Sequence, residues 1–160
     1  MANVMKRQTI LFLILPALLL AGCNLAGPEE RAIAQMVETF VHAIDQSDDD
    51  LAYACLMDQR AFQTLNPSAS ARVDAESFMD EYMSELIQMY RDMKEKYKGH
   101  YVKFKKFRLG NPFYQYKGFS AFKDNEVEIT VDGETETFNI LKIVRIGDRW
   151  LIVSLGTYEY

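Results

Sequence analysis

Hydrophobic and polar positions follow two different periods along the chain, and the change of period falls near its middle. In the first half, apolar residues recur every three or four positions, which is the spacing of one face of an α-helix. Gly27 and Pro28 mark the predicted start of the first helix, and the polar run that begins at Ser47 marks its end. The predicted apolar face consists of Ile33, Met36, Val37, Phe40, Val41 and Ile44.

Two more helices are predicted before the period changes. The acidic residues at 48–50 can cap the start of a short helix. A loop at 66–68 then precedes a long helix, predicted to run from an Asp74 cap to Lys98 and to stop at Gly99. The short helix carries the apolar residues Leu51, Ala54, Cys55 and Leu56. The long helix carries Phe78, Met79, Tyr82, Leu86, Met89, Tyr90, Met93 and Tyr97 on one face.

The second half is rich in aromatic and β-branched residues that alternate with polar ones, which is typical of strands with one buried face. Asp132-Gly133 and Gly147-Asp148 predict tight hairpin turns, and Asn111-Pro112 predicts an earlier turn. Helices followed by an antiparallel meander predict an α+β fold in which N-terminal helices pack on a C-terminal sheet. The predicted strands are residues 101–109, 119–122, 126–131, 135–146 and 149–158.

The first 22 residues have a pattern of their own. Lys6 and Arg7 precede an apolar run at 10–20, and small residues lead into Cys23, which is the order of a secretory signal peptide. The apolar run is too short to span a bilayer as a mature helix. The Leu-Ala-Gly-Cys ending resembles the lipobox of bacterial lipoproteins. The resemblance implies that Cys23 carries a lipid such as palmitate on its sulfur, becomes the new N-terminus and is then acylated.

These patterns predict three parts: a signal peptide at 1–22, a lipidated Cys and short tether at 23–28, and a single α+β domain at 29–160. The tether is so short that the domain is expected close to the membrane surface. Asn24 is not the Asp that resembles an inner-membrane retention signal, so the outer membrane, facing the periplasm, is expected if the source has two membranes. The alternatives are a plain signal peptide with an incidental Cys23, or an uncleaved anchor.

Two short segments of the domain resemble the nuclear transport factor 2-like superfamily. One is the end of the first helix at 44–48 with the Leu-Ala-Tyr-Ala helix at 51–54, and the other is the hairpin at 144–152 with its Gly-Asp-Arg-Trp turn. The resemblance implies a cone-shaped fold whose curved antiparallel sheet closes over the helices. A cystatin-like helix-on-sheet domain fits nearly as well. Enzymes of the cone-shaped superfamily use acids, histidines or tyrosines inside the cone, for which Asp45, Tyr53 and Tyr82 are the candidates.

Charge is unevenly distributed along the chain. The formal net charge of −5 argues against general nucleic-acid binding. Residues 93–123 nevertheless hold nine basic side chains against one acidic one. A candidate contact with an anionic surface, either lipid headgroups, lipopolysaccharide or an acidic partner protein, consists of Lys103, Lys105, Lys106 and Arg108. The plainer interpretation is that lysines complement a helix dipole and protect an edge strand from aggregation.

The sequence contains no motif of a known catalytic, metal-binding or cofactor-binding type, so no catalytic residue, metal or cofactor is predicted. His42 lies opposite the apolar face of its helix, and Cys55 lies among apolar residues as an unreactive thiol is expected to. The predicted function is therefore a membrane-anchored, non-catalytic envelope lipoprotein that binds a protein partner or an apolar ligand. The alternative is an isomerase-like or dehydratase-like enzyme of the cone-shaped superfamily.

Overall fold

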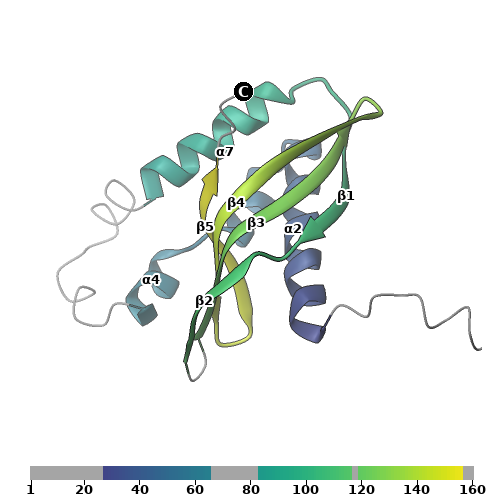
Figure 1. Ribbon diagram of the computed structural model, residues 1–160. Coiled ribbons are helices and arrows are strands. Elements are labelled where there is room, and N and C mark those ends of the chain that lie inside the picture. Colours follow the sequence, from purple (N-terminus) through teal and green to yellow (C-terminus); the bar gives the residue numbers. More distant parts are fainter. Residues whose placement is uncertain (1–26, 66–82, 117–118, 157–160) are drawn as a thin grey trace, which may run out of the picture.

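The computed structural model describes residues 27–65, 83–116 and 119–156. In these residues four helices precede five strands, and the strands form one curved antiparallel sheet on which the helices pack (Figure 1). The predicted α+β class, with N-terminal helices packed on a C-terminal antiparallel sheet, is confirmed. The two strands at the edges of the sheet do not pair with each other, so the sheet does not close into a barrel. None of the described helices is long and apolar enough to cross a membrane.

Helix α2 (Pro28–Gln46) is the predicted first helix. Pro28 stands at its start together with Glu29 and Glu30, whose charges favour the positive end of the helix dipole. The helix ends at Ser47, which adopts a left-handed φ of 55°. The predicted apolar face is confirmed except that Met36 lies at the edge of the core. The buried residues of the helix are Ile33, Val37, Phe40, Val41, Ala43 and Ile44.

Helix α3 (Asp49–Cys55) follows almost at once. The Asp48 side chain accepts a hydrogen bond of 3.0 Å from the backbone N–H of Leu51, which confirms the predicted cap. Its buried face differs from the prediction, because Ala54 is exposed and Ala52 is buried instead. In so short a helix a shift of two positions turns a residue to the opposite side.

Helix α4 (Gln59–Leu65) is not predicted from the sequence. Asp58 accepts a hydrogen bond of 2.7 Å from the backbone N–H of Ala61 and so caps the start of this helix. Seven residues are too few for a helical period to stand out from the pattern of the chain. Leu56, predicted on α3, is buried in the connection between α3 and α4.

Helix α7 (Ser84–Lys96) coincides with the second half of the predicted long helix. Leu86 and Tyr90 are buried along it, and Met83 and Tyr97 are buried at its two ends. The predicted loop at 66–68 and the first part of the long helix, including its Asp74 cap and Met79, lie outside the described residues. Met89 and Met93 pack against the core, where flexible methionine side chains commonly fill irregular gaps.

The five strands form a sheet in the order β1-β3-β4-β5, with β2 also paired to β3. Their bounds are β1 (Val102–Arg108), β2 (Asn111–Tyr116), β3 (Phe119–Val131), β4 (Glu134–Ile146) and β5 (Arg149–Gly156). Both predicted hairpin turns are confirmed. Val131 pairs with Glu134 across Asp132-Gly133, and Ile146 pairs with Arg149 across Gly147-Asp148.

The structure corrects two details of the predicted strands. Residues 119–122 and 126–131 belong to one long strand, β3, rather than two. Asn111-Pro112 is not a turn but the start of β2, where Asn111 pairs with Lys123. Arg108 at the end of β1 pairs with Glu126 in the same register. β1 and β2 therefore lie end to end along one side of β3, so the chain continues past residue 110 instead of reversing.

The junction between β1 and β2 is fixed by Asn125, the one buried polar side chain among the described residues. Its Oδ1 accepts a 3.0 Å hydrogen bond from the backbone N–H of Gly110. Its Nδ2 donates to the carbonyls of Ile140, at 2.9 Å, and Phe122, at 3.3 Å. Asp124 beside it has a φ of 59°, which breaks the regular strand conformation. A Cβ on Gly110 would lie 1.9 Å from the Lys123 carbonyl oxygen, so this close approach requires glycine.

Helix α2 connects the two ends of the sheet. At its first turn, Glu29 lies 3.8 Å from Arg145, close to the β4–β5 hairpin. At its last turn, the Asp45 side chain accepts a 2.8 Å hydrogen bond from the backbone N–H of Val102, close to the β3–β4 hairpin. The 19 residues of α2 span about 28 Å at about 1.5 Å per residue. In Figure 1 these hairpins lie at opposite ends of the sheet.

The helices and the sheet share one apolar core. Trp150 at the start of β5 is 8% exposed, and its ring lies 5.8 Å from the ring of Phe122. Cys55 is a buried free thiol, and burial raises its pKa to about 11. A thiol with so high a pKa is almost entirely protonated at neutral pH, which fits the predicted unreactive core cysteine.

Candidate functional site

An open groove of about 550 Å³ lies between α2 and the first half of β1. One wall is the polar side of α2, whose residues recur at helical spacing opposite the buried face. The other wall is the edge strand of the sheet. The lining residues are Gln35, Glu38, Thr39, His42, Asp45, Gln46, Tyr101, Val102, Lys103 and Phe104.

Two carboxylates fix the position of β1 at this groove. Asp45 on α2 accepts the hydrogen bond from the Val102 N–H, and Asp132 in the β3–β4 turn accepts one of 2.9 Å from the Tyr101 N–H. Asp132 also lies 2.6 Å from His100 Nδ1. The contact with His100 and the bond from Tyr101 hold the pKa of the Asp132 carboxyl below its usual value. The start of β1, which bounds the groove, is therefore held by α2 on one side and by the β3–β4 turn on the other.

The backbone of β1 presents hydrogen-bonding groups to the groove. The Tyr101 carbonyl accepts a 3.0 Å bond from the Asp132 N–H, so the polar groups of Tyr101 face β3. Successive residues of a strand point these groups to alternate sides, so those of Lys103 also face β3, whereas those of Val102 and Phe104 face away from it. Among the described strands β1 pairs only with β3. Its other edge pairs with no described strand at Val102 and Phe104, but Val102 is only 4% exposed and its N–H is bound by Asp45, so Phe104 is the accessible part of this edge.

The predicted basic contact lies on β1 but divides into two pairs. Lys105 contacts Thr135 at 3.0 Å and Glu128 at 3.5 Å. Arg108 forms an ion pair of 2.7 Å with Glu126. In contrast, Lys103 and Lys106 are exposed and take part in no ion pair with any described residue. The free positive charge of the strand is therefore concentrated in these two lysines, and Lys103 is itself part of the groove wall.

The three lysines at the C-terminal end of α7 and just beyond it each pair with a nearby acid. Lys94 pairs with Asp49 at 2.7 Å, and Lys96 pairs with Glu136 at 2.7 Å. Lys98 pairs with Glu95 one turn away, at 3.2 Å. The basic stretch that is continuous in sequence is therefore not a continuous positive surface in space.

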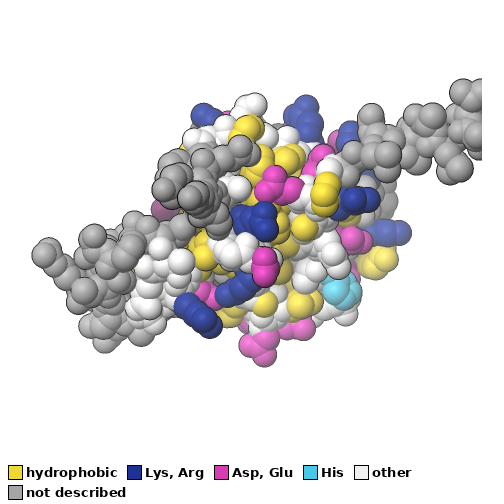
Figure 2. All heavy atoms as spheres, turned by 90° about the horizontal axis from the view of Figure 1, so that it is seen from below, with side chains coloured by type: hydrophobic (Ala, Val, Ile, Leu, Met, Phe, Trp, Pro, Cys, Tyr) yellow, Lys and Arg dark blue, Asp and Glu magenta, His cyan; other side chains and the backbone are white. Residues whose placement is uncertain are grey.

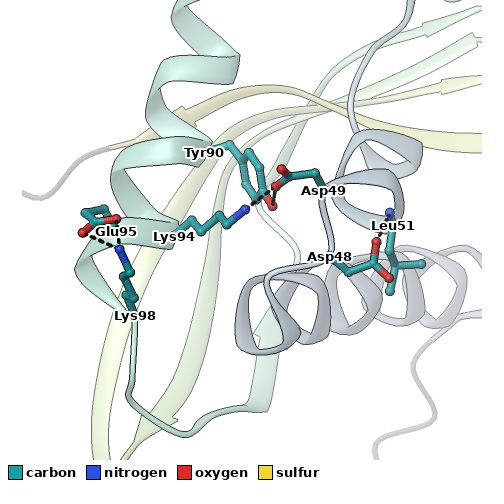
Figure 3. Close-up of polar contacts among 7 residues, drawn as sticks. All are labelled: Asp48, Asp49, Leu51, Tyr90, Lys94, Glu95 and Lys98. Atoms are coloured by element: carbon teal, nitrogen blue, oxygen red, sulfur yellow. Dashed lines mark hydrogen bonds and ion pairs between the residues drawn. The ribbon is translucent and has the colours of Figure 1, made fainter.

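A second polar cluster joins α7 to the start of α3 (Figure 3). The Tyr90 hydroxyl donates a 2.8 Å hydrogen bond to Asp49 Oδ1, which also receives Lys94 Nζ at 2.7 Å. Lys94 and Tyr90 together hold the pKa of the Asp49 carboxyl below its ordinary value of 3.8. Burial and the bond to Asp49 raise the pKa of the Tyr90 hydroxyl. The Asp49 carboxylate and the Tyr90 hydroxyl thus both serve to join α3 to α7.

Changing Tyr90 to phenylalanine should reveal this cluster through the pH dependence of stability. Because the folded-state pKa of Asp49 is depressed, its contribution to stability is present above 3.8 and is lost as the pH falls through the lower folded value. The Tyr90→Phe variant should therefore be less stable than wild type at pH 7, with a difference that shrinks in strong acid. Urea unfolding at both pH values measures this, and a difference independent of pH would contradict the role of Asp49.

Of the residues considered for catalysis, the two that the structure describes have different partners. Asp45 is bonded to β1, whereas the Tyr53 ring packs edge-on against Tyr90 of α7 at 5.7 Å. Tyr82 lies outside the described residues. In the described ranges no three histidine, cysteine or acidic side chains are grouped as metal ligands would be. The acids at 48–50 include the α3 cap and the partner of Lys94.

Sequence reasoning missed the groove and the part that His42 has in it. His42 is exposed, as predicted, but its side of α2 faces the edge of β1 across the groove. The polar residues of α2 recur at helical spacing, which is a signal in the sequence, but the solvent-exposed side of almost any surface helix has the same pattern. No model of a known protein family matches the chain, and no curated protein matches it in sequence.

Proposed function

We propose that this protein is a lipid-anchored envelope lipoprotein whose domain, related to the nuclear transport factor 2-like or cystatin-like folds, binds a protein partner and has no catalytic role. The observation that carries the proposal is the open groove, in which a polar helix face lies beside an unpaired strand edge and an unpaired lysine. Such a groove offers hydrogen bonds to a polypeptide. The buried residues that the structure describes form one apolar cluster, in which Asn125 serves only backbone groups.

The anchor would determine which end of the domain faces the membrane. A lipid on Cys23 followed by a tether of four residues would hold the start of α2 at the bilayer, since each residue spans at most about 3.5 Å. Figure 2 shows the domain from below, the end where α2 begins, and basic, acidic and hydrophobic side chains are interspersed there. The groove extends along α2 from Gln35 to Gln46, with Asp45 and Lys103 at the end far from the tether. It would then face the periplasm, within reach of a soluble or envelope-bound partner.

Lipidation is tested by changing Cys23 to serine. The wild-type protein should label with palmitate, partition with membranes, and begin at a modified Cys23 in mass spectrometry. The Cys23→Ser variant should lose the label and move to the soluble fraction, because the acyl chains that hold the protein at the membrane would be missing. An unmodified Cys23 in a soluble wild-type protein would exclude the anchor.

Partner binding is tested by photo-crosslinking in intact envelopes. Tyr101 at the groove is 63% exposed, and Phe113 on β2 is 46% exposed, so benzoylphenylalanine can replace either aromatic ring with little disturbance. We expect a defined protein adduct from position 101 and not from position 113. Equal adducts from both positions, or none from either under conditions where the protein is anchored, would contradict partner binding at the groove.

A further inference from the structure

We infer that the partner docks as an extended acidic segment that adds to β1 as a further strand of the sheet. This inference rests on the proposed function and specifies how the groove is used. It requires an open strand edge, space beside that edge, and a charge that selects the segment, and each of these is present at Val102–Phe104.

The open edge is short and lies in one place. Phe104 contributes its N–H and its carbonyl, which point away from β3, whereas Val102 is only 4% exposed and its N–H is already bound by Asp45. The register of β1 shifts between Phe104 and Lys106, so a bulge at Lys105 ends the regular edge. Two main-chain groups, both of Phe104, are thus available, which is enough to align one residue pair of a short segment.

Other edges of the described sheet are less suited to strand addition. β2 continues the same side of the sheet, but Pro112 has no N–H and the register shifts again before Tyr114. On the opposite side, β5 is already bridged by the connection after α3, where the Met57 N–H donates a 2.9 Å bond to the Ile152 carbonyl. The first half of β1 is therefore the edge that remains for a partner.

The space beside the edge has the chemistry that a polypeptide needs. Along the opposite wall, α2 lines the groove with Gln35, Thr39 and His42, which can bond to the second edge of an added strand. Glu38 lies on the same wall and would repel acidic side chains that point toward α2, so the acids of the segment must lie on its Lys103 side. Asp45 already binds the Val102 N–H and so marks where the added strand must end. The exposed Tyr101 ring at this end offers an apolar contact.

Charge selects an acidic segment. Lys103 and Lys106 flank the open edge and are not neutralised by any described acid, unlike Lys105 and Arg108. In a strand that lies beside β1, acidic side chains would come within a few ångströms of these two ammonium groups, as in cross-strand pairs. An anionic bilayer is the less fitting occupant, because the edge begins beside Asp45, at the end of α2 far from the tether.

The experiment uses the full-length, lipidated protein in detergent micelles and a labelled hexapeptide of alternating glutamate and valine. Fluorescence anisotropy should show saturable binding, and hydrogen exchange should slow at residues 101–106. A peptide of the same sequence with N-methyl groups on alternate residues cannot pair as a strand. Its affinity should be at least about tenfold lower than that of the unmodified peptide. Equal binding of both peptides would overturn strand addition.

A charge-swapped variant is the matched control. The double variant Lys103→Glu, Lys106→Glu should no longer bind the glutamate peptide and should instead bind a peptide of alternating lysine and valine. Binding of the lysine peptide would also show that the variant is folded. Unchanged preference would overturn the role of the two lysines. Slow exchange of the Phe104 amide without peptide would show that the chain itself covers the edge. If anionic vesicles displaced the peptide from wild type and neutral vesicles did not, the surface would instead be a membrane contact, and the inference would be overturned.

These outcomes are separate from those of the proposed function. A protein adduct at position 101, together with no binding of the glutamate peptide, would retain partner binding and reject strand addition. Absence of any adduct in anchored protein would reject partner binding itself.

Discussion

Replacing Trp150 with alanine is expected to lower the free energy of unfolding by about 3–5 kcal/mol. The indole is 8% exposed, lies 5.8 Å from the Phe122 ring, and is covered on the solvent side by Arg145, whose guanidinium carbon is 5.9 Å from the ring centre. Alanine would leave a cavity where β5 meets β3 and β4. A loss of this size is a large share of the stability of a typical domain.

Thermal or urea unfolding of the purified variant measures the loss. Tyr101→Ala is the matched control, because this aromatic ring is 63% exposed and its removal should change stability by no more than about 0.5 kcal/mol. If Trp150→Ala melted at the wild-type temperature, the indole would have to be exposed in solution, and the start of β5 would become a second candidate binding surface.

Replacing Asn125 with alanine is expected to cost about 2–4 kcal/mol, because the Gly110 N–H and the carbonyls of Ile140 and Phe122 would lose their partner. Asn125 is fully buried, so water cannot replace these bonds without entering the core. The loss should appear as a lower urea midpoint. The distinct variant Gly110→Ala should be comparably unstable, since its Cβ would meet the Lys123 carbonyl oxygen at 1.9 Å.

Two controls separate this junction from general effects of the substitutions. Asn111→Ala removes the same amide from an exposed position of β2, and Gly27→Ala adds a methyl group where nothing lies within 4 Å. Neither should lower stability by more than about 0.5 kcal/mol. An Asn125→Ala variant as stable as Asn111→Ala would mean that the junction of β1 and β2 does not depend on the buried amide.

Local patterns in the sequence were sufficient for the main elements. The helical spacing of Ile33, Val37 and Phe40 predicted α2, and Asp48 predicted the cap of α3, because burial on one face and capping depend on residues close in sequence. The hairpin at Asp132-Gly133 was equally local, since both residues adopt a positive φ that most others avoid. From these elements the α+β class followed.

Local patterns failed where a distant segment decides the conformation. Asn111-Pro112 is typical of a turn, yet here it begins strand β2. The reason is that the part of β3 before Asn125 is free to pair with it, and Asn111 pairs with Lys123. Ala54 and Ala52 are equivalent by composition, and only the packing of α3 against α2 determines which is buried. Helix α4 is too short for its period to be read without its surroundings.

The candidate site likewise combines features that depend on neighbouring residues with features that depend on distant segments. From the sequence alone, a lipid on Cys23 and a basic surface on β1 were predicted, because each prediction depends only on neighbouring residues. Only the tertiary structure decided that α2 lies along β1 and that Glu126 and Glu128 neutralise Arg108 and Lys105. It also decided that Lys103 pairs with no acid in the described part of the chain. Pairing of charges and opening of a strand edge depend on contacts between segments far apart in the chain, and a local pattern does not determine such contacts.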